Sequence, residues 1–245
     1  MQLQLSTWPE VERYLETSAG ILMPIGSTEQ HGPSGLIGTD AICAEVIARA
    51  AGEAAGAMVG PTINVGMAQH HMAFTGSMTL RPSTLIALIR DSVASLAKHG
   101  VTRLYFVNGH GGNTATIGAA FDEIYADSSL GGETGVRCKS VNWWMGTRVR
   151  KLRESLYSGR EGAHATPSEI AVTWFAYPGE VREAAFDSLA PPMQPFADAT
   201  DYRRRFPDGR IGSDPTLADA KDGERLVEAA ATDIAESYAR FIGDA

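Results

Sequence analysis

Short apolar segments alternate four times with segments of helical spacing along this chain of 245 residues, and this alternation is what most constrains the fold. The clearest apolar segment is VTRLYFV at 101–107, which is rich in β-branched and aromatic residues. Because a helix between two parallel strands packs back onto their sheet, the pattern predicts an α/β fold with a mostly parallel sheet covered on both faces. The expected strands are 21–25, 57–63, 101–107 and 136–144, and the expected helices are 8–16, 39–55, 82–99, 114–126, 145–157, 167–175 and 217–242. We expect residues 176–218, rich in Pro and Asp, to be mostly irregular.

The composition favours one globular domain over residues 1–245, because a hydrophobic fraction of 44% is enough for a sizeable core. The net charge is −8, and the only run of three consecutive basic residues is Arg203 to Arg205, which we expect in a solvated loop. Nucleic acid is therefore not expected as a partner. No apolar stretch is long enough to cross a membrane, and the N-terminus lacks the layout of a signal peptide. Cys43 and Cys138 are expected to be buried thiols rather than a disulfide, so we expect a cytoplasmic protein.

The stretch PIGSTEQHGPSGLIGTD, residues 24–40, places several polar side chains directly after the first expected strand. Glu29 and His31 are two residues apart, so in extended backbone they point the same way, and Asp40 opens the next helix. Carboxylates and an imidazole at the carboxyl end of a strand suit a divalent metal. The alternative is a polar surface loop with a helix cap at Thr39 or Asp40.

A second polar stretch, NGHGGN at 108–113, follows the clearest strand. His110 leaves that strand at the sheet edge where Glu29, His31 and Asp40 are expected, which favours a metal-binding or catalytic role. An Asn-Gly turn or a phosphate-binding glycine loop is the alternative, although the spacing fits neither the dinucleotide fingerprint nor the P-loop.

A third stretch, HATPSE at 164–169, has two interpretations that the residues alone leave open. Thr166 and Glu169 form a capping-box pattern with Pro167 at the first helical position. A carboxylate on that first turn, facing the strand ends, is equally well placed for a cation. His164 precedes this turn and is either a site residue or an exposed loop histidine.

The sequence does not decide whether four further side chains belong to the site. His70 and His71 are adjacent, so in extended backbone at most one of them faces the site. Trp143 and Trp144 end an expected strand and belong either to a pocket wall or to the core.

Together these stretches resemble the creatininase (creatinine amidohydrolase) family. The likeness runs from about residue 20 to 230, and the matching segments are PIGSTEQHGPSGLIGTD, GMAQHHMAFTGSMTL, FVNGHGGN, HATPSE and IGSDPTLADAKDGERL. The resemblance implies a creatininase-like three-layer αβα sandwich with a central, mostly parallel sheet. It also implies two divalent metal ions per chain (Zn, Mn or Fe), and many members assemble as hexamers, so a homo-oligomer is expected.

By position, the resemblance implies that Glu29, His31, Asp40 and His110 are metal ligands, with Asp40 bridging. In creatininase a glutamate two residues after the histidine of NGH supplies a further ligand, and here that place is Gly112. Other members carry a later HAGExETS-like motif, with which His164 and Glu169 align. Glu169 is then the expected replacement ligand, and His164 and Glu169 are the expected catalytic residues. The altered loop leaves the substrate open.

The prediction is a metal-dependent amidohydrolase that hydrolyses an amide, cyclic amide or formamide bond of a small molecule through a metal-activated water. His164 would stabilise the oxyanion or protonate the leaving nitrogen, a role suited to an unperturbed pKa near ~6.5. One alternative is a non-catalytic protein of the same fold that binds a small molecule or phosphate ligand. Another is a scaffold whose site has decayed.

Overall fold

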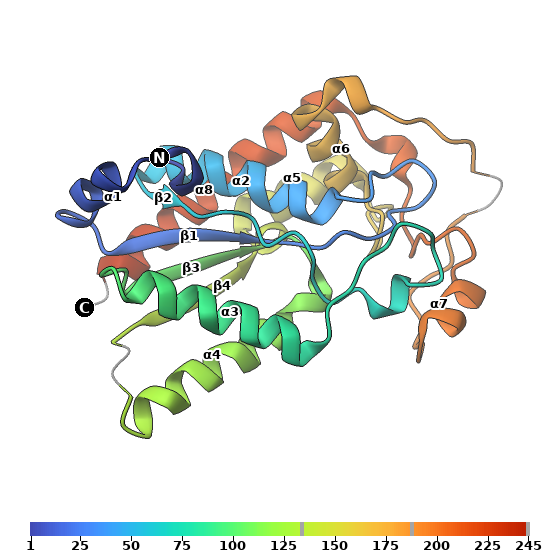
Figure 1. Ribbon diagram of the computed structural model, residues 1–245. Coiled ribbons are helices and arrows are strands. Elements are labelled where there is room, and N and C mark those ends of the chain that lie inside the picture. The colour runs from blue at the N-terminus through green and yellow to red at the C-terminus, as the bar shows by residue number, and fades with distance from the viewer. Residues whose placement is uncertain (133–134, 187–188, 244–245) are drawn as a thin grey trace.

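The computed structural model describes residues 1–132, 135–186 and 189–243. Its centre is a parallel sheet of four strands in the order β2-β1-β3-β4 (Figure 1). The strands span Gly20–Ile25 (β1), Met58–Val59 (β2), Arg103–Asn108 (β3) and Arg137–Asn142 (β4). The predicted parallel sheet is therefore confirmed.

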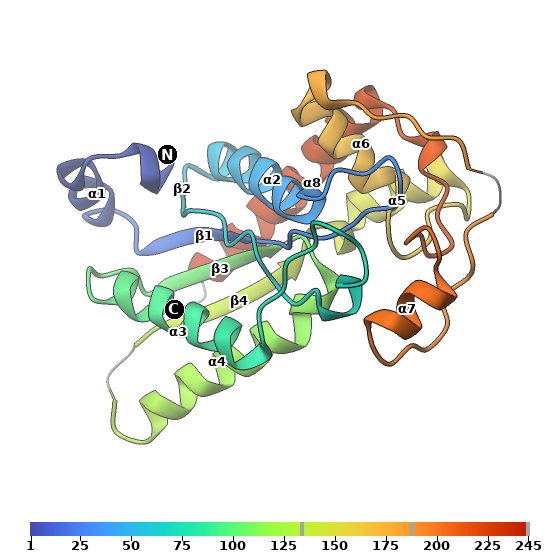
Figure 2. The same cartoon turned by 45° about the vertical axis from the view of Figure 1, so that its right-hand side comes forward.

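Helices cover both faces of this sheet, as Figures 1 and 2 show from two directions. The α-helices span Trp8–Leu15 (α1), Thr39–Ala55 (α2), Pro82–Ala97 (α3), Thr114–Ser129 (α4), Thr147–Tyr157 (α5), Pro167–Ala176 (α6), Ala199–Arg205 (α7) and Ala220–Gly243 (α8). None of the helices that the structure describes is both long and apolar enough to cross a membrane.

Successive strand residues belong to two separate hydrophobic cores, because side chains alternate across a strand. Leu22, Tyr105 and Val107 pack in the core formed with α2, α5, α6 and α8. Ile21 and Phe106 pack in the opposite core, formed with α1, α3 and α4. These two cores and the sheet between them make the predicted αβα sandwich.

The carboxyl ends of the three longer strands lie level with one another. Ile25 pairs with Asn108, and Asn108 pairs with Asn142, so β1, β3 and β4 end at the same edge of the sheet. The polar stretches that follow β1 and β3 are brought together there. Both chain ends lie at the other side of the molecule in Figure 1.

The sequence predictions of two strands were too long. The strand expected at 57–63 is reduced to Met58–Val59 and a single bridge between Ile25 and Ile63. Pro61 lies between these pairings and has no N–H to donate to a ladder. At the opposite edge β4 stops at Asn142, and Trp143–Met145 forms a 3₁₀ helix instead.

Helix α7 lies inside the segment that we expected to be mostly irregular. Asp198 caps it, since its side chain accepts a hydrogen bond from the Asp201 backbone N–H. The arginines expected in a solvated loop are on this helix: Arg205 pairs with Asp201 at 2.9 Å, and Arg203 lies 4.1 Å over the ring of Phe74. The signal that would have found α7 is the Asp cap with a second Asp three residues later.

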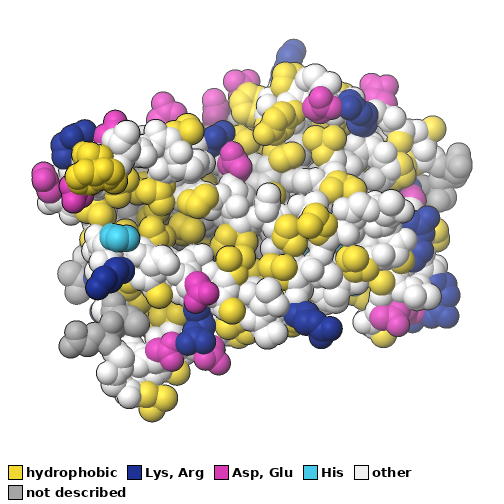
Figure 3. Space-filling view, in the orientation of Figure 1, with side chains coloured by type: hydrophobic (Ala, Val, Ile, Leu, Met, Phe, Trp, Pro, Cys, Tyr) yellow, Lys and Arg dark blue, Asp and Glu magenta, His cyan; other side chains and the backbone are white. Residues whose placement is uncertain are grey.

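The surface carries charges of both signs, and the two thiols differ in burial. On the face shown in Figure 3, acidic and basic side chains are interspersed and no continuous basic patch is visible. Cys43 and Cys138 are both free thiols; Cys43 is fully buried, whereas Cys138 is only partly buried.

Candidate metal centre

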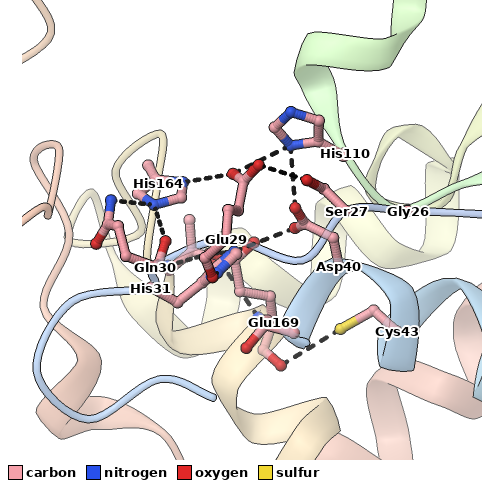
Figure 4. Close-up of polar contacts among 12 residues, drawn as sticks. Gly26, Ser27, Glu29, Gln30, His31, Asp40, Cys43, His110, His164 and Glu169 are labelled. Atoms are coloured by element: carbon pink, nitrogen blue, oxygen red, sulfur yellow. Dashed lines mark hydrogen bonds and ion pairs between the residues drawn. The ribbon is translucent and has the colours of Figure 1, made fainter. Parts of the chain in front are cut away.

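Six polar side chains converge at the carboxyl edge of the sheet, although they come from segments far apart in the sequence (Figure 4). They follow β1 or β3, open α2 or α6, or precede α6. Five are almost completely removed from solvent, and the side chain of Glu169 is 15% exposed. The six residues are Glu29, His31, Asp40, His110, His164 and Glu169. The structure therefore brings together every site residue that the sequence predicted, and we call this cluster the metal centre.

Asp40 lies in the first turn of α2, which meets the sheet edge with almost no space between the backbones. A Cβ atom on Gly109 would overlap the carbonyl oxygen of Asp40, and one on Gly26 would overlap the backbone of Ala41. Only glycine permits this approach, so the ends of β1 and β3 hold Asp40 directly by backbone contact.

One half of the metal centre is formed by Glu29, Asp40 and His110. The Nδ1 atom of His110 lies 3.0 Å from Asp40 Oδ2 and 3.3 Å from Glu29 Oε1. The three side chains each offer one ligand atom, and these atoms lie within 4.8 Å of one another. Two carboxylates and an imidazole are a suitable donor set for Zn, Mn or Fe.

The other half is formed by His31, Asp40 and Glu169. The Nε2 atom of His31 lies 3.1 Å from Asp40 Oδ1 and 3.8 Å from Glu169 Oε1. Asp40 thus turns one oxygen toward each half, which is the arrangement of a bridging carboxylate. A third group, made of Glu29, His31 and His164, also has its ligand atoms within 4.8 Å.

Two buried oxygens of the metal centre fit a bound cation. Glu29 Oε1 and Asp40 Oδ2 are inaccessible to solvent and accept no hydrogen bond from the described residues. A buried carboxylate oxygen without a donor is costly, and such atoms usually have an ion or water as partner. The residues present therefore fit a divalent metal.

Backbone carbonyls decide which nitrogen each histidine turns to the centre. His110 Nε2 lies 2.9 Å from the carbonyl oxygen of Met67, and His31 Nδ1 lies 3.1 Å from that of Glu29. A carbonyl can only accept, so these nitrogens carry the hydrogens. This leaves the lone pairs on His110 Nδ1 and His31 Nε2, the atoms that face the carboxylates.

The carboxylates shift the pKa values of these histidines. Burial by itself would lower the pKa of His31, but the nearby carboxylates, Asp40 foremost, together outweigh it and raise the pKa to about 10. Burial likewise opposes the change at His110, where Glu29 and then Asp40 raise the pKa to about 9. Burial would raise the pKa of Asp40, yet His31 and His110 hold it well below its usual range. Without a cation, protons on the two histidines therefore balance the negative charge.

His164 is held in the opposite protonation state. Its Nε2 donates to the carbonyl of Gln30 at 2.8 Å, and its Nδ1 lies 3.9 Å from Glu29 Oε1. Burial, followed by the neighbouring His71 and His31, lowers the pKa of His164 well below its ordinary value. The expected unperturbed pKa was therefore wrong, and the ring is neutral with a free Nδ1. It is also buried, not an exposed loop histidine.

Glu169 closes the capping box and also faces the cluster, so the two interpretations that the sequence left open are compatible. Its Oε1 accepts the Thr166 N–H at 2.6 Å, and its own N–H donates to Thr166 Oγ1 at 3.3 Å, so the capping box is present. The same Oε1 is the oxygen that faces His31. Burial raises the pKa of this carboxyl to about 7. The helix cap holds the carboxylate at the metal centre.

His71 is a functional candidate that the sequence interpretation did not select. Its Nε2 lies 3.0 Å from Glu29 Oε1, and its ring is stacked on His164 with centroids 4.5 Å apart. The extended backbone assumed for His70 and His71 was wrong, because Gln69–His71 is a 3₁₀ helix, and both rings line the same cavity. Burial, then His31 and His110, lowers the pKa of His71 to about 2.

A cavity of about 510 Å³ opens next to the metal centre. Trp143 and Trp144 form part of its wall, so the aromatic pair after β4 faces the pocket, and Trp143 also packs in the core. The long segment before α8 supplies another part of the wall through Met193, Phe196 and Tyr202. The cavity has room for a small-molecule substrate beside the cluster.

Known proteins resemble this chain over nearly its whole length. Residues 4–238 match the family model described as "Creatininase: Creatinine amidohydrolase". A creatinine amidohydrolase from Pseudomonas putida is 25% identical over 243 residues, which are 94% of this chain and 93% of that protein. A mycofactocin precursor peptide peptidase from Mycobacterium ulcerans is 28% identical over 251 residues, which are 96% of this chain and 87% of that protein.

Solved structures share the fold. A mutant creatininase described as "Zn-Zn type" superimposes with a TM-score of 0.88 at 22% identity, covering 98% of both chains. The structure named "Creatininase Mn" gives a TM-score of 0.86 at 23% identity, again covering 98% of both. At these identities the likeness confirms the three-layer architecture.

Proposed function

The chain belongs to the creatininase family, and from this we propose that it is a metal-dependent amidohydrolase that cleaves the C–N bond of a small amide, cyclic amide or formamide. The family membership makes an amide hydrolase the starting point. Beyond family membership, we propose the kind of metal site and the class of substrate.

The observation that carries the proposal is the position of Asp40 between two sets of ligands. Its Oδ2 lies 3.0 Å from His110 Nδ1, and its Oδ1 lies 3.1 Å from His31 Nε2. Glu29 would complete the first set and Glu169 the second. A carboxylate shared in this way supports a centre for two divalent cations, with Zn, Mn and Fe as the candidates.

When bound there, divalent cations supply Lewis acidity for the amide carbonyl and make a water molecule more acidic. The protein's own residues do the rest. Asp40 and Glu29 hold negative charge where the cations bind, and α6 fixes Glu169 through its capping box. The cavity walls exclude bulk water and orient the amide toward the cluster.

His164 is the residue that we assign to proton transfer. It is neutral, its Nε2–H is fixed by the Gln30 carbonyl, and its Nδ1 lone pair is free. Its Nδ1 can therefore take a proton from the attacking water and give it to the leaving nitrogen, and the lowered pKa of His164 favours the second of these transfers. In the balanced reaction water adds across the C–N bond, giving a carboxylic acid and an amine.

The direct test is to load the purified protein with Mn or Zn and to measure both metal content and amine release. The panel comprises creatinine and other cyclic amides, formamides, and short peptides, the last because one relative is named as a peptide peptidase. We expect two equivalents of metal per chain and turnover of at least one class. A protein that holds no metal, or that holds two and hydrolyses none of the three classes, would contradict the proposal.

A further inference from the structure

Arg153 places a guanidinium in the wall of the active-site cavity. It lies on α5, and it is the one Arg or Lys side chain among the described residues that line the 510 Å³ cavity. Its side chain is 18% exposed, so it is largely desolvated. A charge buried to this degree beside a substrate pocket needs a partner or a function.

Protein acceptors bind only some of the N–H groups of this guanidinium. Arg153 Nε donates to Glu161 Oε1 at 2.8 Å, and Nη1 donates to the Trp144 carbonyl at 3.1 Å. A guanidinium has five N–H groups, so these two bonds leave three, including both on Nη2, with no acceptor among the described residues. Because the side chain lines the cavity and keeps part of its surface exposed, these hydrogens are accessible to a ligand there.

A chain of contacts fixes Arg153 relative to the metal centre. Its partner Glu161 accepts a hydrogen bond from Ser168 Oγ, and Ser168 Oγ lies 3.2 Å from Thr166 Oγ1. Thr166 in turn donates its N–H to Glu169 at 2.6 Å. The guanidinium and the proposed metal ligand are therefore held by the same first turn of α6, which sets a constant span between them.

We propose that Arg153 binds a carboxylate of the substrate, so that the substrate class is an amide bearing a carboxylate at a fixed distance from the scissile bond. This inference rests on the proposed amidohydrolase function. The open edge of the guanidinium, with Nη1 and Nη2 side by side, has the planar fork geometry that pairs with a carboxylate. Trp144, whose carbonyl accepts a hydrogen bond from Arg153, lines the same cavity.

The charge balance favours a monoanionic carboxylate over a phosphate. Glu161 already neutralises one edge of the guanidinium, and no second Arg or Lys among the described lining residues adds to it. A phosphate carries about two negative charges at neutral pH and usually requires more donors or cations than one partly paired arginine. A carboxylate, with one negative charge and two acceptor oxygens, matches the N–H groups of Arg153 that the protein leaves free.

The test compares acids with their carboxamides at three lengths. N-acetylglycine, N-acetyl-β-alanine and N-acetyl-4-aminobutyrate are each paired with the corresponding primary carboxamide, using the metal-loaded protein. Where a compound is hydrolysed the readout is kcat/KM, and where it is not the readout is Kd by calorimetry. We expect the acid to be preferred by about 10- to 100-fold at one length, the scale of a charged hydrogen bond. In Arg153→Gln this preference should fall below about threefold, mainly through KM, and in Arg153→Lys it should be intermediate.

Arg148→Gln is the matched control, because Arg148 is on the same helix but pairs with Asp233 and Glu236 outside this cavity. It should keep the full preference. An equal preference in wild type and Arg153→Gln would overturn the inference, since the metal alone would then bind the acid. Hydrolysis with no preference for acids would also overturn it, while leaving the proposed function intact. The protein could also bind acids preferentially through Arg153 but hydrolyse neither these compounds nor the cyclic amides, formamides and peptides tested above. That result would support the Arg153 site and contradict the proposed function.

Discussion

The Nε2 atom of His71 lies 3.0 Å from Oε1 of Glu29, and both side chains are buried. Gln30 determines which nitrogen of His71 carries the hydrogen. Its Nε2 lies 2.8 Å from His71 Nδ1, 2.9 Å from His164 Nε2 and 3.2 Å from the Gly209 carbonyl. The carbonyl must accept and His164 Nε2 already donates, so the second Gln30 hydrogen goes to His71 Nδ1. His71 Nε2 therefore carries the ring hydrogen, and its close polar contact with Oε1 orients the Glu29 carboxylate.

Replacing His71 should weaken metal binding without removing a ligand. In His71→Ala the Glu29 carboxylate loses this orienting contact, and metal affinity should fall about 10- to 100-fold, the usual effect of a group that supports a ligand. His71→Gln places an amide nitrogen near the position of Nε2 and should recover part of the loss. Competitive titration against a chelator measures both. His99→Ala is the control, because His99 is an exposed histidine after α3, and an equal loss there would refute the specific role.

His110→Ala should remove one metal and abolish hydrolysis. The variant deletes the imidazole that lies within 3.3 Å of both Glu29 and Asp40 and leaves these buried carboxylates without a nitrogen partner at this position. Elemental analysis of the purified variant, with the same His99→Ala control, gives the metal content. A variant that retains two equivalents would show that His110 is not a ligand.

Glu169→Gln separates the capping role from the proposed metal role. Glutamine can still reach the Thr166 N–H, so the free energy of unfolding of the metal-free protein should change by no more than ~1 kcal/mol, the scale of a helix cap. Loss of the negative charge beside His31 should reduce the metal content to about one per chain and turnover by at least ~100-fold.

The chain contains its own control for this substitution. Glu10 closes a capping box with Thr7 at the start of α1, on an exposed helix that contributes nothing to the metal centre. Glu10→Gln should therefore reproduce the small stability change with full metal content and activity. If Glu169→Gln behaves like Glu10→Gln in every measurement, Glu169 is only a helix cap.

The raised histidine pKa values predict how the metal-free protein responds to pH. His31 and His110 have folded-state pKa values of about 10 and about 9, against ~6.5 in an unfolded chain. Their protonated forms therefore stabilise the fold fully below pH ~6.5, and this contribution is lost as pH rises toward 9–10. The Tm of chelator-treated protein should fall across that window. The fall should be smaller in His110→Ala, and an identical slope in both proteins would contradict the assignment.

Metal binding should release the protons that His31 and His110 hold in the metal-free protein. Both histidines must lose a proton to become ligands, so uptake near neutral pH should release about two protons per chain and tighten as pH rises. Calorimetry in buffers of different ionisation enthalpy counts the protons released. No release at pH 7.5 would mean that neither histidine is protonated before the metal binds.

The predictable part of the site was the part that follows regular strands. Glu29, His31 and His110 come directly after β1 and β3, and parallel strands end at one edge, so periodicity was enough to bring them together. His71 depended on a 3₁₀ turn within an irregular stretch, for which the sequence has no periodic signal. Arg153 was assigned only to a helix, because the face that a helix turns to a cavity depends on tertiary packing.

Other expectations stay untested. The long segment before α8 lines the cavity through Met193, Phe196 and Tyr202, and its contact with a neighbouring subunit is a hypothesis that no observation here tests. Assembly into a homo-oligomer stays a prediction that light scattering of the purified protein would check.

The close approach of Gly26 and Gly109 to the first turn of α2 separates what the backbone fixes in this site from what side chains determine. Asp40 is located by main-chain contacts, which side-chain substitutions elsewhere leave in place. Part of the cavity wall, by contrast, comes from the side chains of Arg153 on α5 and of Met193, Phe196 and Tyr202 before α8, which can be exchanged without moving Asp40. Side-chain substitutions can therefore change the shape and charge of the cavity while the position of Asp40 stays the same.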